Sequence, residues 1–293
     1  MIYIHINTAT RLGNWMFQYA AARSRCRDVA FCGNVEYIKT LVSKYGDLFA
    51  SIPVVDKNVV RGVDVYKAPD VKYVPIPEFA GDVVFDGYFQ SEKYFDKELI
   101  RQLFAPSAEM VRRLRAKYGG WLGSSGVTGI SVRRGRDYLR IPDRHPFVGL
   151  KYFKTAIGMF PSDTRFIVCS DDIGWCKKVF RGERFCFVEG ESVLAQLYIH
   201  SLCKNNIISN SSFSWWGAWL NANPNKRVIA PRTWFGMSAR IDASDIYWDG
   251  MELVENRLSC GLWLRAVFNT VCLNLHRDFP KFYQLYSKVR WNK

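Results

Sequence analysis

Between residues 129 and 230 short apolar runs alternate with helix-like stretches, and this alternation limits the possible folds more than any other feature of the chain. The expected strands are 129–133, 165–169, 185–188, 206–209 and 227–230, and the expected helices are 151–160, 173–180, 192–202 and 212–220. Apolar strands separated by helices are typical of a parallel sheet that is covered on both faces. The pattern therefore predicts an α/β fold with a parallel sheet in this half.

The first part of the chain opens with a similar pattern, which becomes irregular after residue 37. The expected elements are strands at 2–6, 29–32 and 82–85 and helices at 14–27, 97–104 and 107–118. A Gly/Ser-rich stretch follows at 119–126, and such stretches often separate domains. We therefore expect an N-terminal domain at 1–122, a second domain at 123–256 and a basic, aromatic, helical tail at 257–293.

Polar clusters follow three of the expected strands in the second domain. They comprise residues 133–137, 170–172 and 210–212. Each cluster alone has an ordinary explanation, either a solvated loop or a helix N-cap. However, ligands of open parallel sheets bind beyond the carboxyl ends of the strands, and all three clusters fall at that edge. Their convergence favours a binding site.

The residue types in these clusters suit a diphosphate. Arg133 and Arg134 offer planar, permanently charged guanidinium groups that bind phosphate oxygens in pairs. Ser211 and Ser212 open a helix whose first N–H groups also attract an anion. If the diphosphate is a leaving group, these donors stabilise the charge that develops as its bond breaks. The clusters thus indicate transfer from a nucleotide-activated donor.

A metal-dependent version of this chemistry is an alternative. Asp171 and Asp172 at a strand end are suited to holding Mg²⁺ or Mn²⁺. We nevertheless expect no metal, because the arginines already compensate the phosphate charge. No His/Cys cluster has zinc spacing, and neither a dinucleotide-binding nor a Gly-Lys-Ser/Thr loop motif is present.

The net charge of +14 requires a third hypothesis, a nucleic-acid or anion-binding module without catalysis. Much of the charge lies in residues 257–293, which contain seven Lys and Arg but only one acidic residue, Asp278. Because Arg265, Asn269 and Asn274 interrupt the apolar run there, we expect no spanning helix. The tail either contacts a membrane surface or packs back on the body.

The eight cysteines show no closely paired framework, which is typical of buried thiols in a reducing compartment. Met1 leads directly into a strand pattern without the features of a signal peptide. We therefore expect a cytoplasmic protein, with contact to the inner face of the membrane as the alternative that the tail leaves open.

Four segments resemble the α-1,2-fucosyltransferases of glycosyltransferase family 11. They are residues 11–20 (RLGNWMFQYA), 132–135 (VRRG), 170–177 (SDDIGWCK) and 209–218 (SNSSFSWWGA). The resemblance implies a GT-B arrangement, in which two Rossmann-like domains face a cleft and the N-terminal one lies on the acceptor side. It also implies GDP-fucose as donor, inversion at the fucose carbon, the 2-hydroxyl of a terminal galactose as acceptor, and no metal or other cofactor.

The resemblance also assigns roles on the donor side. It implies that Arg133 binds the donor diphosphate with help from Arg134, and that Asp171 or Asp172 lies near the guanine. We expect the galactose acceptor to belong to a glycan or to a lipid-linked precursor.

Further residues are assigned along the phosphates and toward the reacting sugar. Ser211, Ser212 and Phe213 are expected along the phosphates. Arg11 and Asn14 are expected to reach from the N-terminal domain toward the fucose. These roles are implied by the resemblance alone.

No residue is clearly marked as the base that an inverting transfer needs near the acceptor hydroxyl. Asp137 is our candidate, and Asp143, His145 and His5 are alternatives on position only. The departing diphosphate is a further alternative as proton acceptor. Because His5 is flanked by apolar residues, we expect it to be a core residue.

The chain departs from the family pattern at several positions. Ser131 stands where the family usually has His, and Arg136 is inserted before Asp137. Thr10 and Trp15 replace the usual Gly and Gln. A Ser hydroxyl does not replace both ring nitrogens of His, so the departure at Ser131 bears on how the base of the donor is recognised.

Overall fold

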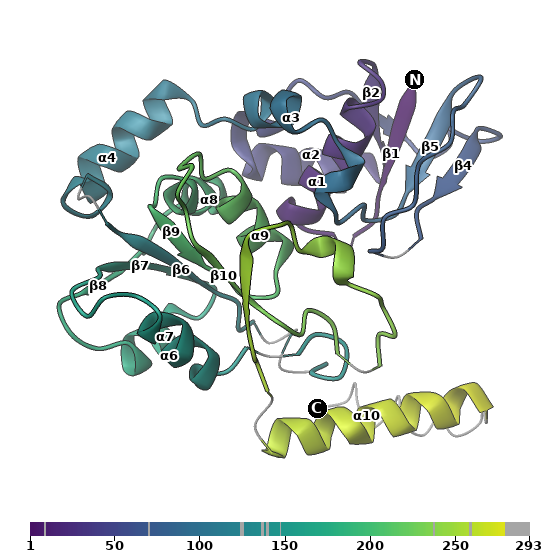
Figure 1. Cartoon of the computed structure of the whole chain (residues 1–293). Helices are drawn as coiled ribbons and strands as arrows, with labels where there is room; N and C mark the ends of the chain where they lie inside the picture. The colour runs from purple at the N-terminus through teal and green to yellow at the C-terminus, as the bar shows by residue number, and fades with distance from the viewer. Residues whose placement is uncertain are drawn as a thin grey trace.

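The computed structural model describes residues 1–8, 10–69, 71–123, 126–135, 138, 141–146, 148–236, 238–257 and 260–278. Two parallel β-sheets dominate this part of the chain (Figure 1). The first sheet has the strand order β3-β2-β1-β5-β4 and the second the order β11-β10-β9-β6-β7-β8. The expected α/β fold is confirmed, and the parallel arrangement extends to both halves.

Among its described residues, the first half forms five strands and four α-helices. They are β1 (Ile2–Ile6), α1 (Leu12–Arg23), β2 (Val29–Gly33), α2 (Val35–Lys44), β3 (Val54–Asp56), β4 (Asp64–Lys67), β5 (Val83–Asp86), α3 (Lys97–Leu103) and α4 (Ala108–Leu122). The sequence did not predict α2, β3 or β4. Strand β3 has only three residues and β4 is largely exposed, so neither carries the apolar alternation that marks a strand.

The second half follows the expected alternation closely. Its elements are β6 (Thr128–Val132), α6 (Leu150–Gly158), β7 (Phe166–Ser170), α7 (Ile173–Val179), β8 (Phe185–Phe187), α8 (Val193–Ser201), β9 (Asn205–Ile207), α9 (Ser212–Trp219), β10 (Val228–Pro231), β11 (Met251–Val254) and α10 (Cys260–Asp278). The half-buried strand β11 was not predicted.

Successive residues of the central strands face two different hydrophobic clusters. Ile130 and Val168 pack with Phe153 of α6 in a cluster of second-half residues. Ile167 and Cys169, on the other face, belong to a larger cluster that continues into the first half. Helices α6 and α7 cover one face of the second sheet, while α8 and α9 lie between the two sheets (Figure 1).

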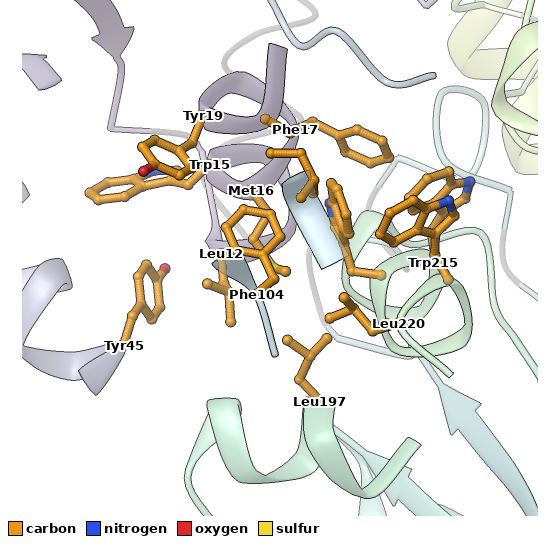
Figure 2. Close-up of a cluster of buried hydrophobic side chains, with 14 of the residues drawn as sticks. Leu12, Trp15, Met16, Phe17, Tyr19, Tyr45, Phe104, Leu197, Trp215 and Leu220 are labelled. Carbon is orange, nitrogen blue, oxygen red and sulfur yellow. The ribbon is translucent and has the colours of Figure 1, made fainter. Parts of the chain in front are cut away.

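The larger cluster joins the two halves through α1 and α9. Phe17 of α1 packs against Trp215 of α9 (Figure 2), with ring centroids 4.5 Å apart. The centroid of the Trp216 ring lies 4.8 Å from that of Phe17. A Cβ atom on Gly13 of α1 would lie 2.5 Å from the backbone nitrogen of Phe213. Only a glycine therefore allows the two helices to approach this closely. The boundary placed near residue 122 remains a prediction.

Helix α10 lies apart from both sheets at the lower edge of the molecule (Figure 1). Among the helices that the structure describes, none combines the length and the apolar character that crossing a bilayer requires. The part of the tail from residue 279 onward lies outside the described residues.

Candidate functional site

The topology places the carboxyl ends of particular strands next to each other. In the second sheet the chain moves from β6 to β7 and β8 on one side and then returns to β9 on the other side of β6. In the first sheet the same reversal occurs between β1 and β5. Such reversals open a crevice at the carboxyl edge, where ligands of open α/β sheets bind.

The loop after β6 is held by the loop after β7. The carboxylate of Asp171 forms an ion pair with the guanidinium of Arg133. It also accepts hydrogen bonds from the backbone nitrogens of Arg134 and Gly135, at 2.7 and 2.8 Å. Asp171 thus fixes the path of the arginine loop and the position of one guanidinium.

Asp172 and Trp175 hold the second guanidinium. The Nε of Arg134 lies 3.3 Å from an Asp172 oxygen, and its guanidinium lies 4.2 Å from the centre of the Trp175 ring. The other Asp172 oxygen accepts from the backbone nitrogen of Trp175 and so caps α7. The ordinary N-cap explanation therefore holds for Asp172, which also pairs with an arginine.

The residues that end β9 support the arginine loop from its other side. The Ser209 hydroxyl accepts a hydrogen bond from the backbone nitrogen of Arg133 at 3.0 Å and donates one to the Ser131 carbonyl at 2.7 Å. Ser131 is 4% exposed, and its hydroxyl lies 2.6 Å from that of Ser214 in α9. The Ser131 side chain is therefore part of the packing between β6 and α9.

Tyr138 is a further neighbour of Arg133 that sequence reasoning missed. Its ring centre lies 4.9 Å from the Arg133 guanidinium, and its hydroxyl donates a hydrogen bond to the carbonyl of Asn210 at 2.9 Å. The ring also stacks on His145, with centroids 5.0 Å apart. An aromatic residue five positions after an arginine was the available signal, but only the folded loop brings the two together.

The N-termini of α1 and α9 meet beside this loop. Arg11 and Ser211 are the N-cap residues: the Arg11 side chain has no acceptor atom, and the Ser211 hydroxyl makes no capping hydrogen bond. A Cβ atom on Gly13 would lie 2.6 Å from the Ser212 hydroxyl, so the first turns of both helices are in contact. The positive ends of two helix dipoles, one from each half, therefore converge.

Asn14 and Phe213 lie in these first turns. The Oδ1 of Asn14 accepts a hydrogen bond from Gln90, which follows β5, at 2.7 Å. Phe213 is half-buried and packs against the larger hydrophobic cluster. The structure thus brings the first turns that carry Asn14 and Ser212 together, and the roles of these residues at the donor stay predictions.

The candidate bases lie in different surroundings. Asp137 is outside the described residues. Asp143 is 1% exposed and accepts hydrogen bonds from Asn269 and Ser238, so it connects α10 to the body. The expectation that His5 belongs to the core is wrong: its side chain is 42% exposed and lies 3.1 Å from Asp86, because alternate residues of β1 face away from α1.

This arrangement can bind an anion more readily than a cation. The Asp171 oxygens already accept from a guanidinium and from two backbone N–H groups, which leaves them poorly placed to ligate a metal. Two guanidiniums and two helix N-termini supply donors for phosphate oxygens. Within the described ranges, no group of three or more His, Cys, Asp or Glu side chains has metal-binding geometry.

Comparison with known proteins identifies similar sequences. The model of glycosyl transferase family 11 matches residues 63–252. The O-antigen biosynthesis glycosyltransferase WbnK of Escherichia coli is 29% identical over 280 aligned residues, which cover 76% of this chain and 92% of that protein. An alpha-1,2-colitosyltransferase of E. coli is 35% identical over 170 residues, which cover 53% of this chain and 57% of that enzyme.

Solved fucosyltransferases show a looser likeness. NodZ from Bradyrhizobium is 14% identical with a TM-score of 0.45, and the match covers 73% of this chain and 92% of NodZ. POFUT1 is 11% identical with a TM-score of 0.47, and that match covers 78% of this chain and 97% of POFUT1. The description of the fold therefore rests on the two parallel sheets and not on these structural matches.

Proposed function

This chain belongs to glycosyl transferase family 11, and from that premise we propose that it transfers L-fucose from GDP-fucose to the 2-hydroxyl of a terminal galactose with inversion at the fucose carbon. The acceptor is a glycan of the bacterial surface or its lipid-linked precursor. The similarity to an O-antigen biosynthesis glycosyltransferase supports the surface glycan.

The observation that carries this proposal is the placement of Arg133 and Arg134 in one loop at a sheet reversal, where Ser209, just before α9, holds the backbone of Arg133. A departing GDP carries its new negative charge on the diphosphate, where guanidinium forks and helix N–H groups stabilise it most. In this proposal Arg133 binds the diphosphate, Arg134 assists, and Ser211, Ser212 and Phe213 lie along the phosphates.

The first turn of α1 serves the reacting sugar in the same proposal. Arg11 and Asn14 reach the fucose from the first half, because Gly13 sets α1 directly against Ser212. Asp137 acts as the base for the acceptor hydroxyl. If the sugar–phosphate bond breaks early, the departing diphosphate accepts the proton instead.

The two aspartates also have roles in the proposal. Asp171 or Asp172 lies near the guanine, beyond the arginines that they hold. Catalysis needs no metal and no other cofactor, which is supported by the N–H donors that already surround Asp171. Loss of activity in the presence of a chelator, with recovery on addition of Mn²⁺, would contradict this part of the proposal.

Colitose is a second candidate for the transferred sugar. The relative that shares 35% identity over 170 residues is named an alpha-1,2-colitosyltransferase, which supports the α-1,2 linkage and raises the question of the sugar. Both candidates keep the GDP-binding arrangement and differ only at the pyranose ring.

The first test is calorimetric titration of the protein with GDP-fucose, GDP-colitose, GDP-mannose, UDP-galactose and free GDP, with chelator present. We expect the GDP compounds to bind and UDP-galactose not to bind. Transfer to a galactose-terminated oligosaccharide then identifies the sugar, and linkage analysis of the product identifies the acceptor hydroxyl. Turnover with colitose alone would favour the second candidate, and absence of GDP binding would overturn both.

The matched variants are Arg133→Ala and Arg181→Ala. Arg181 lies between α7 and β8, at the opposite edge of the second sheet, and its side chain bonds to the Lys178 carbonyl. We expect Arg133→Ala to lower turnover at least a hundredfold with little change in the unfolding temperature. Arg181→Ala should behave like the unmodified protein. Full activity in Arg133→Ala would show that this arginine does not bind the donor diphosphate.

A further inference from the structure

The outward face of α10 is apolar where a surface helix is normally polar. Trp263, Leu264, Phe268 and Val271 are 49%, 57%, 62% and 49% exposed. Residues 264, 268 and 271 are separated by four and three positions, so they share one face of the helix. A surface helix of a globular protein turns such a face toward the core.

The other face of α10 is already packed on the body, so the orientation of the helix is fixed. Ala266 is 1% exposed and Asn269 is 5% exposed. The Asn269 amide donates a 2.8 Å hydrogen bond to the buried carboxylate of Asp143, which also accepts from Ser238. Rotating the helix to bury its apolar face would break this connection.

The charge around α10 selects an anionic occupant for that face. Three exposed arginines lie near the helix. Arg265 is part of α10, Arg257 precedes it, and Arg144 follows Asp143, which is bonded to Asn269 of α10. Residues 257–293 carry seven Lys and Arg and a single acidic residue, Asp278. A second copy would bring the same three exposed arginines against these, and the like charges would repel. A bilayer with anionic lipids satisfies the apolar face and the charge together.

We propose that α10 is a membrane-docking helix that lies along an anionic bilayer surface, with Trp263, Leu264, Phe268 and Val271 inserted among the lipids. The helix remains fixed to the body through Asn269 and Asp143, so the whole molecule has one orientation on the membrane. This proposal does not depend on the transferred sugar, because the docking surface contains none of the residues assigned to the donor.

The test is cosedimentation of the full chain with vesicles of phosphatidylglycerol and phosphatidylethanolamine, and with vesicles of phosphatidylcholine alone. We expect the protein to pellet with the anionic vesicles at low salt and to bind at least tenfold more weakly to phosphatidylcholine. The double variant Leu264→Gln/Phe268→Gln should lose at least tenfold in affinity for anionic vesicles. These side chains are exposed, so the variant should fold normally, which circular dichroism can verify.

The matched control is Val59→Gln/Val65→Gln, which replaces two apolar side chains of the first half that are 60% and 54% exposed. It should bind vesicles as the unmodified protein does. Equal binding by both double variants would show that the basic residues alone hold the protein to lipid, and would overturn the proposal. Failure of the unmodified protein to pellet with anionic vesicles would also overturn the proposal. This holds whether light scattering shows the protein to be a monomer or a dimer.

Discussion

His200 occupies an unusually restrictive position for a titratable residue. It is 1% exposed, and neither ring nitrogen has a hydrogen-bond partner among the described residues. A Cβ atom added to Gly129 would lie 2.7 Å from the Nδ1 of His200. A Cβ atom added to Gly217 would lie 2.8 Å from the Cβ of His200. The imidazole therefore fits between a strand and a helix in its neutral form.

We predict that His200 makes the fold sensitive to acid. Burial lowers the pKa of His200 from about 6.5 to about 4. Between these values the unfolded chain binds a proton that the folded chain does not, so the free energy of unfolding falls as the pH falls. The slope contributed by one such group is at most about 1.4 kcal/mol per pH unit.

The measurement is urea denaturation of the unmodified protein and of His200→Gln between pH 7 and pH 4. Other groups titrate in this range, so the difference between the two proteins is the relevant quantity. The variant should lose less stability on acidification. Parallel curves would mean that the buried imidazole is not the group that responds.

At this scale the sequence predicted residues that follow strands but not the contacts between loops. Arg133, Asp171 and Ser211 could be placed at one edge because each follows the carboxyl end of a strand of the same parallel sheet. The ring of Tyr138 over Arg133 depends on the folded path of the loop, which leaves no periodic signal. The exposure of His5 could not be predicted because it depends on which face of β1 the helices cover.

At the scale of elements, the contact between α1 and α9 is the feature that positions the candidate site. Both helices begin directly after the carboxyl edge of their sheets, and Gly13 allows their first turns to touch. We predict that Gly13→Ala destabilises the protein by several kcal/mol, because its Cβ would lie 2.5 Å from backbone atoms of α9 that cannot move independently.

Gly158→Ala is the matched control, because it lies at the end of α6 and no atom lies within 4 Å of its added Cβ. Alanine favours a helix over glycine by up to about 1 kcal/mol, so this variant should be neutral or slightly more stable. Thermal unfolding followed by circular dichroism compares the two variants. Equal stability in both would show that α1 and α9 do not need so close an approach.

Most elements of the second half were predicted closely because strands such as β7 and β10 are buried and largely apolar. The strand expected at 129–133, for example, is β6 at Thr128–Val132. The first half was predicted less well because β4 is largely exposed and carries no apolar alternation. Helix α2 was missed although Asn34 caps its N-terminus.

At the scale of the whole molecule, the two sheets share one hydrophobic cluster and should unfold together. Phe17 is fully buried between them and contacts two tryptophans of the other half (Figure 2). We predict a single transition in which tryptophan fluorescence and circular dichroism change at the same denaturant concentration. Phe17→Ala should lower the free energy of unfolding by about 3–5 kcal/mol and so move that transition to a lower denaturant concentration.

Phe153→Ala provides the comparison, because Phe153 is equally buried but packs only with second-half residues. It should shift the same single transition without splitting it. Two separate transitions, with only one of them responding to Phe153→Ala, would show that the halves unfold independently. The sequence predicted two domains from a Gly/Ser-rich stretch, but it carries no periodic signal for a cluster built from residues some 200 positions apart.

The close contact between Gly13 and α9 also limits how this chain can be recombined with a relative. A chimaera that joined the first 122 residues of this chain to the remainder of a relative would pair an α1 and an α9 from different parents. A larger residue at position 13, or a smaller one opposite Phe17, would then clash or leave a void between the sheets. Successful hybrids should therefore exchange residues 11–20 together with residues 209–220, and leave the connecting segment to either parent.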